Sequence, residues 1–385
     1  MADPSLILRN LETQPSGSSH FPAHIALKSC GGPNIATGLL SVATNSGRDI
    51  KPTWTPSFLP HQNQEKFEDG VLIYKPVMDA ARIVNGVEQD VVSKSVSVRD
   101  GSEEVQTFEL LTSAPLASDP RNHTPPLLTV MQVPDEPEQR LLVMPLLRLH
   151  DDPRFETFGE AIAFFTQTCE GIQCMHEHRI EHRGCTHHNI MVDPTGMYSV
   201  PFHPAKQNMR RDWKGKAKPR RTRTQLRPRY FLIDFGLSRS YPPSAGDAPM
   251  DLPIQGCDKT VPEHENEDVP CDSSAVDVYY LGNLVREEFM MRYHGFSFMR
   301  PLVEDMVATD PSKRPKMDEV VARFKEIRHS VNFWKLRSRM VSRKEWRIVG
   351  FGRSFGHWYR RLGYIVTRTA AIPDPQYRVR LSPTL

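Results

Sequence analysis

The chain has 385 residues, of which 38% are apolar and 25% are charged, and its formal net charge is +3. This composition is typical of a globular protein with a sizeable core, built as one large domain or two smaller ones. No apolar run approaches the roughly 18 residues needed to cross a bilayer, so no transmembrane segment is expected. The N-terminus lacks a basic leader followed by an apolar stretch, so we expect no secretory signal and a cytoplasmic or nuclear location. The six scattered cysteines are then expected to be reduced thiols.

The net charge conceals two strongly basic segments. Residues 206–229 contain 11 Lys and Arg against one Asp, and residues 333–385 contain 12 against one Glu and one Asp. Each segment has a net charge of +10, and the rest of the chain, with 26 basic and 43 acidic residues, has −17. This asymmetry predicts that the basic segments contact either an anionic partner or the acidic body of the same chain.

The first part of the chain reads as disorder followed by strands. Residues 1–65 are rich in Pro, Ser, Gly and Asn, which predicts a mostly disordered segment. The pair Asn85-Gly86 is typical of a hairpin turn between two strands. We predict three short strands in this region, at Val71–Tyr74, Ala81–Val84 and Asp90–Val96. A helix at Ser102–Ser113 is expected next, followed by a pair of strands at Thr129–Val133 and Arg140–Leu146.

The pattern then becomes helical. Apolar residues recur every three or four positions in Phe158–His178, which predicts a helix with one buried face. Val276–Met291 and Asp318–Val331 are also predicted helices, and the prolines of Asp310–Pro315 mark a boundary before the second. We therefore expect an α+β protein whose strands come first and whose helices follow.

Two segments carry the chemistry. The apolar strand Tyr230–Ile233 ends in Asp234-Phe235-Gly236, which places a carboxylate at a strand end where it can approach Mg²⁺. Upstream, the segment His182–Asn189 contains His182-Arg183-Gly184 and ends in Asn189, just before the predicted short strand Ile190–Val192. A protein kinase catalytic loop has His-Arg-Asp, four residues and then Asn.

Three further motifs follow in order: Val261-Pro262-Glu263, Asp277–Gly282 and Asp310–Pro315. With these, the chain resembles the eukaryotic protein kinases, and within them a group of kinase-like proteins from fungi, over Val71 to Val331. The resemblance implies a bilobal fold that binds ATP and Mg²⁺. It has a small β-rich N-lobe at 66–147, an α-helical C-lobe at 148–332 and a basic aromatic C-terminal extension at 333–385.

The resemblance also implies residue roles. Asn189 and Asp234 would bind metal, and Asp277 would hold the backbone of the catalytic loop around His182 and Arg183. Glu263 would pair with Arg314 to anchor the segment that follows Gly236. Three nucleotide-site roles fall in the N-lobe and hinge: Lys94 to hold phosphates, with Glu104 as its helix partner and Glu109 as a rival; Met144 as gatekeeper; and Leu147 in the hinge. A surface lysine on an edge strand is the alternative for Lys94.

The chain departs from the kinase pattern at three places. Gly184 replaces the Asp that accepts the substrate hydroxyl proton. His187 or His188 could substitute as base, but the interpretation we favour is that they are ordinary loop histidines, because they are offset from the Asp position. The stretch Lys75–Ala81, expected to match the glycine-rich loop, has no glycine. Gly256 stands where Ser/Thr kinases often carry a Thr. We therefore expect a kinase-like protein with weak or absent catalysis.

Two alternatives remain open: an active Ser/Thr kinase with a substitute base, and a scaffold that binds polyanions through its basic segments. The spacing of Asn189 and Asp234 implies an insertion at 202–229, and the tail interleaves Lys and Arg with aromatic residues. Such segments suit nucleic acid, an anionic membrane or nuclear import. The interpretation we favour is a solvated insertion and a tail whose aromatic residues pack on the body. The motifs specify no protein substrate or partner.

Overall fold

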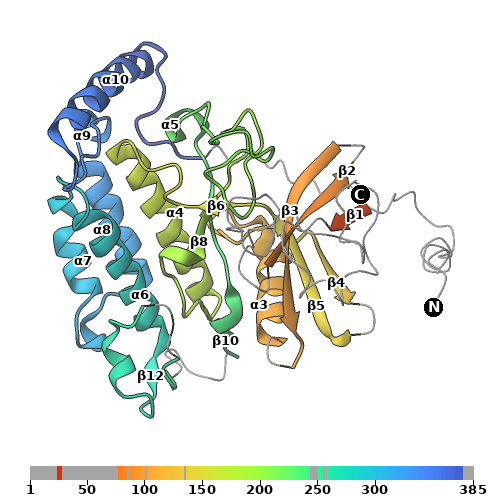
Figure 1. The fold of residues 1–385 in the computed structure, drawn as a ribbon. Helices are drawn as coiled ribbons and strands as arrows, with labels where there is room; N and C mark the ends of the chain where they lie inside the picture. Colours follow the sequence, from red (N-terminus) through yellow and green to blue (C-terminus); the bar gives the residue numbers. More distant parts are fainter. Residues whose placement is uncertain are drawn as a thin grey trace, which may run out of the picture.

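The structure is a computed structural model that describes residues 24–27, 77–84, 87–99, 102–133, 136–242, 250–254, 256 and 258–375. It confirms an α+β protein: an antiparallel sheet with one helix is followed by a mainly helical part (Figure 1). None of the helices within these ranges is both long and apolar enough to cross a membrane.

The main sheet has five antiparallel strands in the order β1-β2-β3-β5-β4. Its strands are β1 (His24–Leu27), β2 (Val77–Val84), β3 (Val87–Ser97), β4 (Thr129–Val133) and β5 (Glu136–Pro145). Strands β2 and β3 pair with Val84 opposite Val87, so they form the hairpin that Asn85-Gly86 predicts, although the turn itself lies outside the described residues. Side chains alternate across the sheet: Leu141 and Val143 belong to a small cluster on one face, whereas Leu142 joins the main core.

Helix α3 (Ser102–Thr112) and the short turn η3 (Leu116–Ser118) cover the sheet on the side of the main core. Phe108 and Leu111 of this helix are buried against Val96 and Leu142 of the sheet. Apolar residues three apart place both side chains on one face of the helix. The same helix also contacts the later segments η5 (Phe235–Leu237) and β10 (Arg239–Ser240), so it joins the sheet to the helical part.

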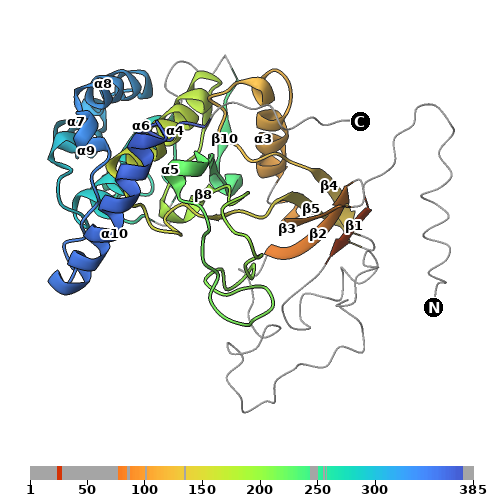
Figure 2. The same ribbon diagram turned by 90° about the horizontal axis from the view of Figure 1, so that it is seen from above.

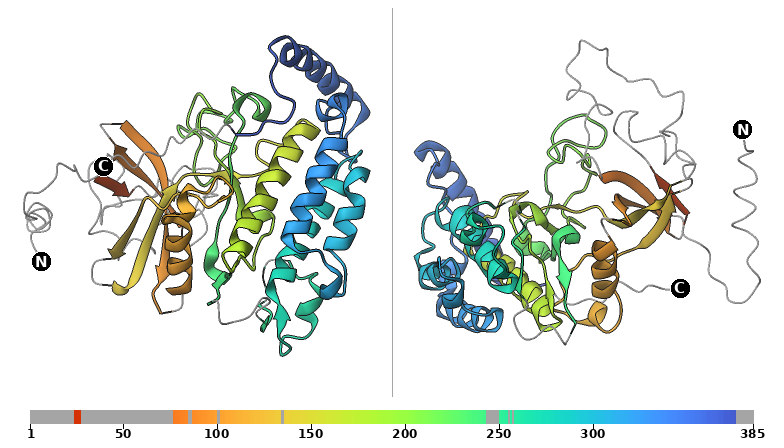
Figure 3. Two further views of the ribbon diagram at one scale, coloured as in Figure 1. Left: turned by 180° about the vertical axis from the view of Figure 1, so that it is seen from behind. Right: turned by 90° about the horizontal axis from the view of Figure 1, so that it is seen from below.

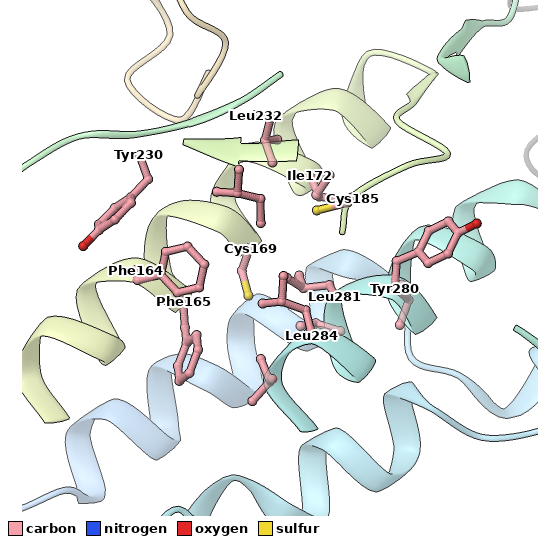
Figure 4. Close-up of a cluster of buried hydrophobic side chains, with 14 of the residues drawn as sticks. Phe164, Phe165, Cys169, Ile172, Cys185, Tyr230, Leu232, Tyr280, Leu281 and Leu284 are labelled. Atoms are coloured by element: carbon pink, nitrogen blue, oxygen red, sulfur yellow. The ribbon is translucent and has the colours of Figure 1, made fainter. Parts of the chain in front are cut away.

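The helical part packs around α4 (Phe158–Glu177), which contacts both α6 (Ser273–Leu284) and α8 (Met317–Ser330). Helix α7 (Arg300–Met306) packs on α6 and α8. A capping box starts α4. The Thr157 side chain accepts a hydrogen bond from the Glu160 backbone N–H, and the Glu160 carboxylate accepts one from the Thr157 backbone N–H. Figure 4 shows the core that results, with Phe164, Phe165 and Cys169 of α4 facing Leu281 and Leu284 of α6.

Three small sheets hold the connecting loops, with strand order β6-β8-β9 in the first and the pairs β7 with β10 and β11 with β12 in the others. These strands are β6 (Arg148–Leu149), β7 (Ile180–Glu181), β8 (Ile190–Val192), β9 (Tyr230–Leu232), β10 (Arg239–Ser240), β11 (Met250–Asp251) and β12 (Cys271–Asp272). The short helical turns are η4 (His187–Asn189), α5 (Arg223–Leu226), η5 (Phe235–Leu237), η7 (Pro262–Glu265), η8 (Val285–Met290), η9 (Ser297–Met299), η10 (Pro311–Lys313) and α9 (Phe333–Leu336).

A long helix, α10 (Arg347–Val366), follows and lies at the end of the helical part away from the main sheet (Figures 1 and 3). Most of its aromatic residues, and Trp346 before it, are exposed, so the expectation that the aromatic residues of the tail pack on the body is wrong for most of them. Only His357 and Tyr364 of this helix are buried. The physical reason is that the helix turns its polar side to the body, where Arg360 pairs with Glu156.

Other predictions need smaller corrections. A strand forms at His24–Leu27, inside the segment expected to be disordered, because its backbone pairs with β2; the rest of residues 1–65 is not described. The predicted strand at Val71–Tyr74 also lies outside the described residues. A single helix was predicted from Val276 to Met291. In the structure the regular α-helix ends at Leu284, and the chain continues as the π-helical turn η8. Cys169, Cys174, Cys185 and Cys271 are free thiols, as expected, and Cys30 and Cys257 are not described.

Candidate active site

Lys94, Glu104 and Asp234 meet although they come from three separate segments. The Lys94 ammonium lies 2.5 Å from Glu104 Oε1 and 2.7 Å from Asp234 Oδ1. Lys94 stands near the middle of β3, between Val77 of β2 and Leu142 of β5, so it is not on an edge strand. The rival Glu109 is exposed on α3. The carboxylate partner of Lys94 on this helix is therefore Glu104.

The two carboxylates differ in their surroundings. The Glu104 side chain is 8% exposed, whereas that of Asp234 is 50% exposed. Burial, only partly offset by Lys94, raises the pKa of Glu104. Burial alone would lower the pKa of Lys94, but attraction by Glu104 and then Asp234 raises it. Lys94 is therefore a fixed cation, with Glu104 behind it and Asp234 open to solvent.

Asp234 follows β9 and adopts a left-handed backbone conformation (φ 65°, ψ 72°). The next residue, Phe235, is buried, and its ring lies 5.3 Å from that of Phe108 on α3. This contact holds the turn against the helix that carries Glu104. An ideal Cβ at Gly236 would lie 3.4 Å from an oxygen of each carboxylate, so the glycine lies directly beside the pair.

Asp277 holds the backbone of the segment that begins at His182. Its fully buried carboxylate accepts hydrogen bonds from the backbone N–H groups of His182 (2.8 Å) and Arg183 (2.7 Å). His176 Nε2 also lies 3.0 Å from the same side chain. A buried carboxylate that accepts several bonds fixes the loop rather than exchanging protons with it.

Arg183 is buried in a left-handed conformation (φ 58°) and is tied to residues far along the chain. Its guanidinium donates to Asp251 Oδ2 (2.9 Å) and to the Leu252 carbonyl (2.7 Å). Arg239 also pairs with Asp251 (3.1 Å). One carboxylate therefore pairs with two arginines beside the loop, an arrangement that the sequence motifs did not indicate.

Gly184 stands where the resemblance to kinases implies an Asp, and there is room for a Cβ. An ideal Cβ would meet Asn189 Nδ2 at 3.4 Å and His182 Nδ1 at 3.7 Å, which are ordinary contacts with side chains. Asn189 donates to the Gly184 carbonyl (2.9 Å), so its amide nitrogen braces the loop and its Oδ1 is the atom that could bind a cation. Strand pairing of Ile190 with Leu232 brings Asn189 and Asp234 to neighbouring strand ends.

Gly256 lies against the same loop. An ideal Cβ there would come within 2.9 Å of the Tyr280 hydroxyl and 3.7 Å of the Arg183 carbonyl. Tyr280 is buried and comes from α6, so it fills the space that a larger residue at position 256 would need. Gly256 is therefore favoured by a close approach that only the fold reveals.

Glu263 and Arg314 form a bidentate ion pair. The distances are 2.6 Å and 2.8 Å, and the side chains are 7% and 0% exposed. Arg314 also donates to the carbonyls of Ala275 (2.9 Å) and Ala308 (2.8 Å). The pair therefore ties the segment before α6 to the loop before α8.

Met144 and Leu147 lie at the end of β5, and the insertion covers this region. Met144 pairs with Val92 of β3 and is half-buried. Gln207 of the insertion donates to the Leu147 carbonyl (3.0 Å), and Arg148 donates back to the Gln207 carbonyl (2.6 Å). The insertion is thus folded against the chain beside Leu147, a contact that its basic composition did not signal.

One of the two histidines considered as substitute bases, His187, packs against other residues. His187 Nδ1 lies 3.7 Å from Glu288 Oε2 and its Nε2 lies 3.9 Å from Asp151 Oδ2, while its ring packs edge-on against that of His150. His188 is exposed. His187 is therefore directed toward the helical part and not toward Asp234.

In the described ranges no three His, Cys, Asp or Glu side chains cluster as ligands for a transition metal. Mg²⁺ has different requirements, because it is held by one or two carboxylates and keeps several waters or phosphate oxygens as ligands. The half-exposed Asp234 and the neighbouring Asn189 fit that chemistry. In comparisons with known proteins, no family model and no curated protein matches this chain.

Proposed function

We propose that this chain is a protein kinase-like protein that binds ATP with Mg²⁺ and has weak or absent phosphotransferase activity. In this proposal the main sheet and α3 are the N-lobe, and the part from Arg148 onward is the C-lobe with its insertion and its C-terminal extension. The nucleotide would lie between them, with Met144 and Leu147 beside the base.

The arrangement of Lys94, Glu104 and Asp234 carries the proposal. Phosphoryl transfer needs a cation on the phosphates and a carboxylate on the metal, held in fixed relation. Lys94 and Asp234 are 140 positions apart, yet their charged atoms lie 2.7 Å from each other. The strand order β1-β2-β3-β5-β4, with Lys94 on β3 and Glu104 on the following helix, supports the same interpretation.

When bound, Mg²⁺ would neutralise phosphate charge and orient the terminal phosphate. Asp234 and the Asn189 amide oxygen are the residues that would hold it, and Lys94 would contact the phosphates. Asp277 keeps the loop that carries Asn189 in place through its bonds to His182 and Arg183. In this proposal the described residues supply a cation for the phosphates and oxygen ligands for the metal.

Transfer of the phosphate lacks its base. Gly184 has no atom that could accept the substrate hydroxyl proton, and a positioned base is worth about 10²–10⁴-fold in rate. The contacts of His187 with Asp151 and Glu288 argue against it as the substitute in the alternative of an active Ser/Thr kinase. Polyanion contact through the basic segments is compatible with the nucleotide site.

The substitution Gly184→Asp tests the catalytic half of the proposal. The Cβ fits, so we expect the variant to fold and to transfer phosphate from radiolabelled ATP, to itself or to water, about 10²–10⁴-fold faster than the wild type. Adding Asp234→Ala to the variant should abolish the gain. A wild-type rate equal to that of the Gly184→Asp variant would contradict the missing-base argument, and would revive the active-kinase alternative.

A further inference from the structure

Helix α10 presents a continuous apolar stripe to solvent. Residues three or four apart along the helix are exposed by 41% to 87%, and they are Ile348, Phe351, Phe355, Trp358, Leu362 and Val366. An amphipathic helix of a globular protein normally turns such a stripe toward its own core. Here the buried residues His357 and Tyr364 lie on the other side, so the body covers only the polar face.

The aromatic residues continue beyond the helix. Trp334 of α9 is 63% exposed and Trp346, just before α10, is 81% exposed. With Trp358 of α10, three of the five tryptophans of the chain are exposed on α9, on α10 or at the residue before α10. Trp side chains of this kind concentrate at the boundary between water and lipid, where the ring is apolar and the indole N–H is hydrated.

The charge of this region is positive. The segment Arg347–Val366 contains four arginines and no Asp or Glu. Exposed cations also flank the helix: Lys344 precedes it and Arg368 follows it. A face that is apolar in its centre and cationic at its edges matches an interfacial helix on an anionic bilayer.

A pocket opens between α10 and the body, on the side of the helix that carries His357. It encloses about 320 Å³, and Arg154, Arg339, Arg353 and Arg360 line it together with His357 and Glu156. Carboxylates balance part of this charge, since Glu156 pairs with Arg360 and Glu345 pairs with Arg339 and Arg353. Burial, followed by repulsion from Arg353, lowers the pKa of Arg154. Gly352 and Gly356 also line the pocket, so no side chain of the helix closes it there.

The basic insertion lies next to this helix. Thr222 and Tyr364 share a hydrogen bond of 2.7 Å, and α5 lies beside α10 in two views (Figures 1 and 2). The insertion carries exposed cations at Lys214, Lys216, Lys218, Arg220 and Arg221. The end of the basic insertion at α5 therefore lies beside α10.

We propose that α10 and its arginine-lined pocket bind the surface of an anionic phospholipid bilayer. The apolar stripe enters the boundary between headgroups and acyl chains, and the pocket takes a headgroup phosphate. The inference is independent of the nucleotide site, because none of its residues belongs to that site.

A bilayer explains the surface better than a nucleic acid does. Aromatic rings can stack on bases and arginines can pair with phosphates, but Ile348, Leu362 and Val366 would gain nothing from either contact. A bilayer uses the aliphatic residues, the tryptophans and the cations together. Apart from this pocket, the inward side of α10 is in contact with the body.

Flotation of the full chain with vesicles tests this inference. We expect binding to vesicles of phosphatidylcholine with phosphatidylserine, and at least about 10-fold weaker binding to phosphatidylcholine alone. The double variant Phe355→Ser, Trp358→Ser should lose about 10-fold or more of the affinity, because both side chains are already exposed and only the bilayer buries them. Met250→Ser, an equally exposed residue on β11, is the matched control and should bind like the wild type.

The pocket has its own test. Arg353→Gln with Arg360→Gln should remove most of the preference for phosphatidylserine while the apolar stripe keeps some binding to both vesicles. Asp234→Ala should bind vesicles normally. The inference is overturned if wild type fails to float with either vesicle or if the Phe355, Trp358 variant floats equally well. It is also overturned if the stripe proves to bind nucleic acid or a second copy of the chain in place of vesicles.

Discussion

Buried histidines make the stability of this protein sensitive to acid. Burial, followed by the charge of Arg229 at His123 and of His187 at His150, lowers the pKa of each to about 3. An unfolded histidine titrates near 6.5. The unfolded chain therefore binds more protons than the folded one below that value, so the stability held above pH 6.5 is lost as pH falls toward 3.

The substitution His150→Phe tests this at one position. The ring stacks on Phe164 at 4.6 Å, a contact that Phe can keep, while the hydrogen bond from Nδ1 to the Ile190 carbonyl is lost. We expect a lower free energy of unfolding at pH 7, but a shallower loss below pH 6, by up to about 1.4 kcal/mol per pH unit. Urea denaturation at several pH values measures both. Parallel pH profiles for variant and wild type would show that His150 is not responsible.

Among the elements, the segment that leads into α6 depends on the Glu263–Arg314 pair. Removing one partner leaves a charge or its donors buried without a counterpart, so Glu263→Gln and Arg314→Ala should each cost about 3–5 kcal/mol in urea denaturation. Arg323→Ala is the control, because its pairs with Asp305 and Glu319 are exposed and should contribute about 0–1 kcal/mol. If Arg323→Ala lowered the free energy of unfolding as much as Glu263→Gln or Arg314→Ala does, burial would not be what makes the Glu263–Arg314 pair strong.

Elements with clear periodicity could be predicted from the sequence. The helices α3, α4 and α8 and the strand β4 lie within a few residues of their predicted bounds, because apolar spacing encodes them. The strand β1 could not be found, since four residues form it only by pairing with β2. Helix α10 was also missed: it has four glycines, and its apolar face is not matched by any surface of the body.

The candidate site divides in the same way. Lys94, Glu104, Asn189 and Asp234 could be named from motifs, because phosphate and metal chemistry requires those residue types in a fixed order. Asp251, Tyr280 and Gln207 could not, because each acts through a partner distant in the chain. The stretch Lys75–Ala81 was expected to match a glycine-rich loop, but from Val77 onward it belongs to strand β2; the segment joining β1 to β2 lies outside the described residues.

At the scale of the whole molecule, the proposal joins a nucleotide site to a lipid-binding surface at the opposite end of the helical part (Figure 3). The nucleotide site and the lipid-binding surface are built from different residues, so the experiments on one can contradict it without affecting the other. A protein of this kind would act by position and conformation, with nucleotide stabilising the arrangement of the sheet and the helices around Lys94 and Asp234.

Thermal unfolding with and without ATP and Mg²⁺ tests whether nucleotide binds at Lys94 and Asp234. We expect a saturable rise in Tm for the wild type, equivalent to about 2.7 kcal/mol when ATP reaches 100 times its Kd. Asp268→Ala, which removes an exposed carboxylate elsewhere, should keep that rise, and Asp234→Ala should lose it. No rise in the wild type at any nucleotide concentration, or an equal rise in the Asp234→Ala variant, would contradict a nucleotide site at Lys94 and Asp234.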